Sequence, residues 1–185
     1  MPRSFIAIDL DEEVRNNLVR VQSSLKETGG DLKIVEPENI HLTLRFLGEI
    51  SRSKLRAVKD VLNEISYPTP FEIEVSSLGV FPNPSYIRVV WAGVDEGSDE
   101  LVSIRKDIDN GLSQIGISPD DKDFTPHYTI ARVKSGKAKE RIKSLVEDHS
   151  DTAWGKYRAE KLELMESELT SEGPIYTTLE TFRFE

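Results

Sequence analysis

The sequence predicts an α+β fold made of two similar lobes. Stretches in which apolar and polar residues alternate, as in strands, are interspersed with stretches whose apolar residues recur every three or four positions, as in helices. In each half of the chain, a helix precedes a proline-containing loop, a strand beginning His-x-Thr, and a further helix. At 185 residues, the chain is short enough for one hydrophobic core. We therefore expect residues 1–185 to form a single domain.

The N-terminal part of the chain predicts a strand, a helix and a further extended segment. Residues 3–10 alternate and are rich in isoleucine and phenylalanine, which favours a strand. Residues 11–30 have acidic side chains at their start and two glycines at their end, as helix termini prefer. Residues 31–50 are predicted to be extended chain interrupted by Pro37. The apolar face of the helix consists of Val14, Leu18, Val21 and Leu25.

The middle of the chain predicts a hairpin between two helices. A helix at about 51–66, capped by a serine, precedes a strand at 71–81. The turn sequence PNPS joins this strand to a second one at 86–94. The next helix covers roughly residues 98–115. The apolar stripes of the two helices are Leu55, Val58, Leu62 and Ile65, and Leu101, Ile104, Ile108, Leu112 and Ile115.

The last third of the chain predicts three strands and one helix. An acidic loop, SPDDKDFTP, leads into a strand at 127–134. A helix at about 136–148 follows. Two strands at 158–169 and 174–184 are joined by a turn at TSEGP. The apolar residues of the helix are Ala138, Ile142, Leu145 and Val146.

Composition narrows the function classes. The chain has no cysteine, which excludes disulfides, thiolate catalysis and zinc–sulfur sites. A formal net charge of −9 argues against a protein that binds a long nucleic-acid duplex through its phosphates, but it is compatible with a local basic cleft. The apolar runs are too short to cross a membrane, and the N-terminus has no signal-peptide pattern. We expect a cytoplasmic protein without a membrane partner.

Two of the three histidines open matching segments, HLTLRFLG at 41–48 and HYTIARVK at 127–134. In a strand, residues i and i+2 point to the same face. His41 and Thr43 should therefore project together, and so should His127 and Thr129. The residues expected on the opposite face, toward the core, are Leu42, Leu44 and Phe46 in the first segment and Tyr128 and Ile130 in the second.

If a pseudo-two-fold axis relates the lobes, the two histidine–threonine pairs face one another across a cleft. Opening a phosphodiester by in-line attack requires a base on the nucleophile and an acid on the leaving oxygen. Histidine can take either part near neutral pH. Threonine hydroxyls can donate to the oxygens on which charge builds. This chemistry requires no metal or other cofactor.

Other interpretations compete with this one. A lone His-x-Thr is more often structural than catalytic, and only the second copy favours function. A metal site could use Asp121 and Asp123 near His127, but no known metal-ligand spacing accompanies them, and the acidic loop is expected to be solvated. His149 lies outside the pattern and is expected at an exposed helix end.

The two segments resemble the paired H-x-T-x signatures of the 2H phosphoesterase superfamily. Within it the chain resembles the RNA 2′,3′-cyclic phosphodiesterases, also called LigT-like proteins or 2′-5′ RNA ligases. The similarity covers nearly the whole chain. The blocks that carry it are RSFIAIDL, PENIHLTLRFLGEI, LGVFPNPSYIRVVWAGV, FTPHYTIARVK and LMESELTSEGPIYTTLETF.

The resemblance implies a bilobal α+β fold with two antiparallel sheets and flanking helices around a central cleft. It implies hydrolysis of RNA 2′,3′-cyclic phosphate ends to 2′-phosphates without metal. His41 would protonate the departing 3′ oxygen and His127 would activate water. Thr43 and Thr129 would bind the phosphate, and the resemblance gives Arg132 the same role. Strict alternation places this arginine on the opposite face, so it reaches the phosphate only if the strand bulges or ends there, or if its side chain curls round the edge. The alternative role is that of a surface arginine that covers apolar neighbours.

Weaker candidates complete the predicted site. Arg3, Arg45 and Arg88 could add positive potential, and Phe81 or Tyr128 could stack on a base. The expected partners are RNA ends or short nucleotides carrying a cyclic phosphate, and the chain is expected to act as a monomer. Two alternatives remain open, namely reversible 2′-5′ RNA ligation in the same cleft and a non-catalytic module that binds nucleotides or RNA ends.

Overall fold

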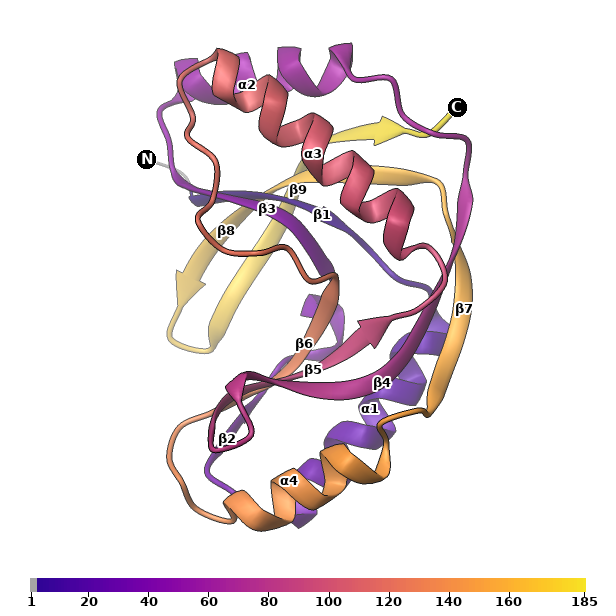
Figure 1. The fold of residues 1–185 in the computed structure, drawn as a ribbon. Helices are drawn as coiled ribbons and strands as arrows, with labels where there is room; N and C mark the ends of the chain where they lie inside the picture. Colours follow the sequence, from indigo (N-terminus) through magenta and orange to yellow (C-terminus); the bar gives the residue numbers. More distant parts are fainter. Residues whose placement is uncertain (1–2) are drawn as a thin grey trace.

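The structure is a computed structural model that describes residues 3–185. Within this range the chain forms strands, four α-helices and one short 3-10 turn (Figure 1). The elements are β1 (Arg3–Ile8), α1 (Glu12–Glu27), β2 (Leu32–Ile34), η1 (Pro37–Asn39), β3 (Leu42–Glu49), α2 (Arg52–Glu64), β4 (Phe71–Asn83), β5 (Tyr86–Val94), α3 (Ser98–Gln114), β6 (His127–Val133), α4 (Lys139–Asp148), β7 (Ala153–Ala159), β8 (Lys161–Thr170) and β9 (Gly173–Arg183).

The strands form one antiparallel sheet in the order β7-β4-β5-β6-β3-β1-β8-β9, with β2 added to β6. The expected α+β class is confirmed. The two sheets expected from the resemblance are instead joined at their centre, because β3 and β6 pair through Leu42 and Tyr128. Four strands lie on each side of this junction, and the sheet is strongly curved (Figure 1).

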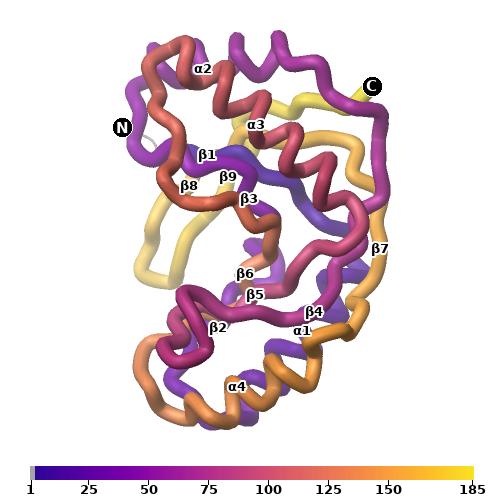
Figure 2. Tube along the Cα trace, viewed as in Figure 1, coloured from indigo at the N-terminus to yellow at the C-terminus, as the bar shows by residue number. Residues whose placement is uncertain are grey.

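Two helices cover each half of the sheet. Helices α1 and α4 pack on one another and on the half that contains β4 to β7. Helices α2 and α3 pack on one another and on the half that contains β3 and β9. Figure 2 shows that β1, at the start of the chain, lies beside β8, near its end, and the two strands pair antiparallel. Each half of the fold is therefore assembled from both ends of the sequence.

The helices follow from their apolar stripes and caps. The Asp11 side chain accepts a hydrogen bond from the Val14 amide (3.0 Å) at the start of α1, and Ser51 does the same for Lys54 (3.1 Å) at α2. In residues 3–185 no helix is long and apolar enough to cross a membrane. The stripe residues that are buried in the core are Val14, Leu18, Val21, Leu25, Leu55, Val58, Leu62, Leu101, Ile104, Ile108, Leu112 and Ile142.

One strand was missing from the sequence prediction. Strand β7 pairs with β4, but its alternation is broken at Gly155, where the register with Val75 shifts. The positive φ of Gly155 (134°) lies outside the range that other residues adopt comfortably. The buried side chains of Trp154 and Tyr157 hold β7 against the core. A broken alternation flanked by charged residues carries little strand signal, so this strand could not be predicted.

Candidate active site

The two predicted motif strands lie side by side at the centre of the sheet. Leu42 is the Cα partner of Tyr128, and each of these residues directly follows a motif histidine. This register aligns His41 with Thr129 and Thr43 with His127 across the junction. Leu42 and Tyr128 are fully buried on the core side. The four motif side chains therefore share the face of the sheet that is opposite the core.

Each motif histidine is held by a backbone carbonyl two residues before it. The Nδ1 atom of His41 lies 2.6 Å from the Asn39 carbonyl oxygen, and Nδ1 of His127 lies 2.6 Å from that of Thr125. A carbonyl oxygen only accepts, so Nδ1 carries the proton in both rings. The Nε2 atom of each ring is then free to accept a proton when the ring is neutral and to donate one when the ring is charged.

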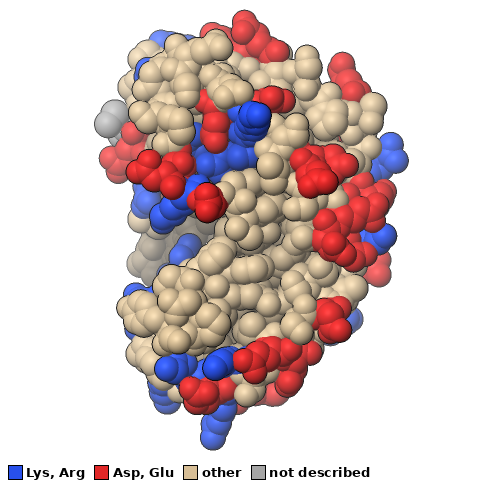
Figure 3. Space-filling model, in the orientation of Figure 1, with Lys and Arg blue, Asp and Glu red and all other residues tan. Residues whose placement is uncertain are grey.

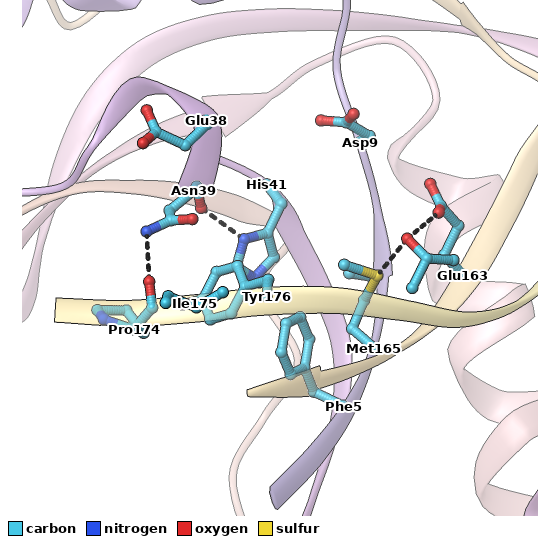
Figure 4. Close-up of a pocket in the computed structure, with 12 residues that line it drawn as sticks. Phe5, Asp9, Glu38, Asn39, His41, Glu163, Met165, Pro174, Ile175 and Tyr176 are labelled. Atoms are coloured by element: carbon cyan, nitrogen blue, oxygen red, sulfur yellow. Dashed lines mark hydrogen bonds between the residues drawn. The ribbon is translucent and has the colours of Figure 1, made fainter. Parts of the chain in front are cut away.

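A pocket of about 310 Å³ opens beside His41. Figure 4 shows the ring between Asn39 and the aromatic side chains of Phe5 and Tyr176. Phe5 stacks on it with centroids 5.0 Å apart, and Tyr176 meets it edge-on at 5.2 Å. On the motif strand itself, the hydroxyl of Thr43 lies 2.8 Å from His41 Nε2. The remaining residues that line the pocket include Asp9, Glu38, Glu163, Met165 and Thr178.

On the other half of the cleft, aromatic side chains surround His127. Phe81 contacts the ring edge-on, with centroids 5.0 Å apart, and Trp91 lies 5.9 Å away. Phe81 and Trp91 also pack on one another at 5.0 Å. Gly79 makes this arrangement possible, because a Cβ there would lie 2.2 Å from the Trp91 indole ring. The pocket beside His41 does not extend to these residues.

Charge distinguishes the two histidines. Burial lowers the pKa of both below the ordinary histidine value of 6.5. For His41 the Asn39 carbonyl and the Asp9 carboxylate counteract this by raising its pKa, while the nearby His127 lowers it further. For His127, the Thr125 carbonyl raises the pKa and the Arg132 guanidinium lowers it. In Figure 3, both basic and acidic side chains lie along the upper edge of the hollow at the left of the view.

A bulge in each motif strand changes which side chains enter the cleft. The pairing of β5 with β6 shifts register at Ile130, and that of β1 with β3 shifts at Leu44. Both residues stand three positions after a motif histidine. The bulge at Ile130 turns Arg132 to the face that His127 occupies, where its charge acts on His127 and Tyr176. The strand thus bulges in the way that Arg132 requires to reach the cleft, and the alternative in which it covers apolar neighbours on the opposite face is not supported.

The matching bulge at Leu44 corrects a second prediction. Phe46 was expected in the core, but it is 63% exposed and lies 5.9 Å from Phe5 on the cleft side. Arg45, considered as a cleft residue, is instead buried at 5% exposure. It is bonded to the Asp109 carboxylate and to the Ser118 carbonyl. The extra residue in the strand exchanges the two faces for Arg45 and Phe46, and a second register shift follows at Leu47.

Each bulge is held by a buried polar side chain from a helix. The Gln22 amide, on α1, donates to the carbonyl of Ile130 (2.9 Å) and to that of Val35 (2.8 Å). Arg105, on α3, donates to the carbonyl of Leu44 (2.8 Å). Bulged backbone leaves groups without ladder partners, and these donors help to satisfy them, together with the Val35 amide, which also donates to the Ile130 carbonyl (3.1 Å). Sequence reasoning missed both residues, whose only signal is a polar side chain on the apolar face of an amphipathic helix.

Comparison with known proteins gives a consistent family. The model described as AKAP7 2′5′ RNA ligase-like domain matches residues 2–184. The protein named RNA 2′,3′-cyclic phosphodiesterase of Methanothermobacter thermautotrophicus is 40% identical over 182 residues, which is 98% of each chain. The protein of the same name from Methanocaldococcus jannaschii is 38% identical over 177 residues, 96% of this chain and 98% of its own. The chain belongs to the LigT-like 2H phosphoesterases.

Solved structures of LigT-like proteins agree with this fold. The Thermus thermophilus protein TT0787 superposes with a TM-score of 0.83 at 30% sequence identity, covering 98% of this chain and 97% of its own. LigT of Escherichia coli superposes with a TM-score of 0.78 at 24% identity, covering 100% and 99%. At that identity, the second match supports the fold alone.

Several weaker candidates of this LigT-like chain lie away from the cleft. Tyr128 is fully buried and bonded to the hydroxyl of Tyr157, so the prediction that it stacks on a base is wrong. Arg88 is exposed and lies over the Tyr86 ring at 5.5 Å. Arg3 is exposed at the start of β1. His149 ends α4 half-buried rather than exposed, with Nδ1 3.0 Å from the Thr152 hydroxyl.

Asp121 and Asp123 are exposed in the loop before β6. Among residues 3–185, no group of three or more histidine or carboxylate side chains is placed to hold a metal ion.

Proposed function

We propose that the protein hydrolyses 2′,3′-cyclic phosphodiester ends of RNA or nucleotides to 2′-phosphates, with His41 and His127 as acid and base and without metal. The observation that carries this proposal is the matched anchoring of two imidazoles on one face, which leaves an Nε2 atom on each for proton transfer. The names of the archaeal relatives, RNA 2′,3′-cyclic phosphodiesterase, support the same reaction.

The proposed step transfers two protons. Nε2 of neutral His127 takes a proton from water as the water oxygen bonds to phosphorus. The bond from phosphorus to O3′ breaks, and Nε2 of protonated His41 gives its proton to O3′. The product has a 2′-phosphate and a 3′-hydroxyl. His127 is left protonated and His41 neutral, and exchange with solvent restores both.

The surroundings favour this division of roles. The Asp9 carboxylate raises the pKa of His41 and so favours its charged, acidic form. The Arg132 guanidinium lowers the pKa of His127 and so favours its neutral, basic form. Burial opposes protonation of both rings, and a bound phosphate anion would counteract burial by raising both pKa values. The charge asymmetry therefore supports His41, on the Asp9 side of the cleft, as the acid.

Three further residues are proposed to hold the phosphate. Thr43 and Thr129 share the face of the histidines, so their hydroxyls can donate to the non-bridging oxygens. The contact between Thr43 and His41 Nε2 would then be exchanged for contacts with substrate. Arg132 supplies a fixed positive charge where negative charge builds during attack.

The terminal nucleoside is proposed to occupy the pocket beside His41. The departing O3′ belongs to this nucleoside, and the acid that protonates it must lie next to it. The pocket offers aromatic surface at Phe5 and Tyr176 and carboxylates at Glu38 and Glu163. A base can stack on the first and donate amino hydrogens to the second, whereas a phosphate would be repelled there.

A second candidate function is 2′-5′ RNA ligation. In that reaction a 5′-hydroxyl takes the place of water on the His127 side. The aromatic surface of Phe81 and Trp91 beside His127 favours it, because a second nucleoside could stack there. The family model, with its 2′5′ RNA ligase-like description, is consistent with this alternative.

One assay separates these functions. The protein is incubated with a 2′,3′-cyclic nucleotide in excess EDTA, and the products are separated. We expect a 2′-monophosphate. RNA halves with cyclic-phosphate and 5′-hydroxyl ends are then tested for joining. A 3′-monophosphate would contradict the proposed breaking of the bond from phosphorus to O3′, and no product from either test would contradict both enzymatic functions. Binding without turnover would favour the non-catalytic module.

We also infer that residues 1–185 act as one domain and as a monomer. The proposed acid and base come from strands of the same chain that pair with each other at Leu42 and Tyr128. The cleft needs no side chain from a second copy to complete the pair.

A further inference from the structure

Two cations stand directly opposite one another beside the cleft. Lys33 on β2 and Arg132 on β6 are Cα partners in the antiparallel pairing of these strands. Both are exposed. Directly opposite residues point to the same face of a sheet, with their Cβ atoms about 4.5–5.5 Å apart. The neighbours that face the core are Leu32, Ile34, Ala131 and Val133.

This pairing is unfavourable without an anion. Like charges directly opposite one another destabilise a sheet. Carboxylates exceed cations in this chain, at 33 against 24. Nevertheless, the ion pairs found in the described part of the chain are formed by other cations, namely Arg15, Arg45, Arg105, Lys156, Arg158 and Lys161. The positive charge of the Lys33–Arg132 pair is therefore not neutralised by a carboxylate of the described residues and is available to bind an anionic ligand.

Arg132 of this pair lies near one wall of the pocket beside His41. The charge of Arg132 lowers the pKa of both His127 and Tyr176, so the guanidinium lies near each of them. Tyr176 lines the pocket that holds the terminal nucleoside in the proposed function. Figure 4 shows Tyr176 beside His41 at this wall. Arg132 therefore lies near the Tyr176 wall of the pocket, and Lys33 is its Cα partner on β2.

We propose that Lys33, beside Arg132, binds the phosphodiester that precedes the terminal nucleotide, so that the preferred substrate is an RNA end of two or more nucleotides. This inference rests on the proposed function. The ligand is a nucleic-acid backbone because a phosphodiester is the anion that substrate itself carries next to the terminal nucleoside. The pocket walls are acidic at Glu38 and Glu163, which directs the backbone phosphate out toward the cations.

The test compares three substrates. They are 2′,3′-cyclic AMP, a diadenosine with a 2′,3′-cyclic phosphate end, and the same dinucleotide with an uncharged methylphosphonate linkage. We expect kcat/KM to be about tenfold higher for the natural dinucleotide than for the mononucleotide, the usual worth of one charge-assisted contact. The methylphosphonate should lose this advantage.

The variant K33Q isolates the proposed contact. It should reduce kcat/KM for the natural dinucleotide to about the mononucleotide value and leave the other two substrates unchanged. The slope of log kcat/KM against log salt for the dinucleotide should fall by about one. The matched control K106Q removes an exposed charge from α3 on the other half of the fold and should change neither the preference nor the slope.

The results distinguish failure of this inference from failure of the proposed function. If K33Q lowers turnover of all three substrates equally, or none, the upstream phosphate site is wrong while the hydrolytic function stands. If wild type hydrolyses no substrate, the proposed function fails. Affinity for the dinucleotide ApAp relative to 3′-AMP, measured by calorimetry, then tests the site separately. An equal loss of affinity for both in K33Q, or no loss, would overturn it.

Discussion

Leu42 pairs with Tyr128 at the only Cα pairing that joins β3 to β6 within residues 3–185. Each of these residues is fully buried, and each follows a motif histidine. The pseudo-two-fold axis of the sheet therefore passes between the two motifs. This relationship explains why His41 and His127 are anchored in the same way. The charged groups around the two rings nevertheless differ.

The histidines are tested first by removal. We expect His41→Ala and His127→Ala each to reduce turnover of a 2′,3′-cyclic nucleotide by about 10²–10⁴, the usual worth of a general acid or base. The double variant should be little worse than the worse single one, because the two act as a unit. His149→Ala is the matched control and should retain activity. Near-normal turnover by either motif variant, with an unchanged circular dichroism spectrum, would exclude the mechanism.

The division of roles is tested by the leaving group. An aryl phosphodiester releases a phenolate that requires no proton. On this substrate, His41→Ala should recover much of its lost rate, because its missing acid is no longer needed. His127→Ala should not recover, because water still requires a base. Rates of both variants on the aryl and cyclic substrates measure this. Rescue of His127→Ala instead would reverse the two roles.

The pH dependence follows from the lowered pKa values. Catalysis requires His41 protonated and His127 neutral, so kcat/KM should be bell-shaped. Burial lowers the pKa of both rings in the free protein, so the centre of the bell should lie below about 6.5. A bound phosphate raises both values, so the bell for kcat should be centred at higher pH. A kcat bell centred at lower pH would contradict this.

The charge asymmetry predicts opposite shifts. Asp9→Asn removes a charge that raises the pKa of His41, so the alkaline limb should move to lower pH. Arg132→Gln removes a charge that lowers the pKa of His127, so the acidic limb should move to higher pH. Because the pair is coupled, each imidazole is titrated by NMR as well. Asp11→Asn keeps the α1 cap and should shift neither ring. Shifts of the opposite sign would contradict the assignment.

The β6 bulge is tested through Gln22. Gln22→Met should remove the side-chain donor from the Val35 carbonyl and one of the two donors from the Ile130 carbonyl, which keeps the Val35 amide, and reduce the free energy of unfolding by about 1–3 kcal/mol. If this donor keeps Arg132 in the cleft, the pKa of His127 should rise as well. Arg132→Gln should then cost less in the Gln22→Met background than in wild type.

Two measurements separate this positioning from stability alone. Gln114→Met makes the same chemical change at an exposed site of α3 and should alter stability by less than about 0.5 kcal/mol. Full additivity of Gln22→Met and Arg132→Gln in kcat/KM, with an unchanged pKa of His127, would show that Gln22 does not position Arg132.

Local sequence patterns were sufficient to predict much of the secondary structure and the orientation of the first residues of each motif. Helical stripes and caps predicted α1, α2 and α3 to within a few residues, because each depends on side chains a few positions apart. Period-two alternation predicted that each histidine shares a face with its threonine, because the first three residues of each motif precede the bulge.

The face that each side chain occupies after the third motif residue was decided only by the tertiary structure. The bulges at Leu44 and Ile130 reverse the faces of Arg45, Phe46 and Arg132. A bulge forms where a neighbouring strand sets a different register and a donor satisfies the freed carbonyl. For Ile130 the donors are the Val35 amide and the Gln22 side chain, which is 108 positions away in sequence, and for Leu44 the donor is Arg105, which is 61 positions away. No local pattern contains such a partner, so the place of Arg132 in the cleft depends on the folded sheet.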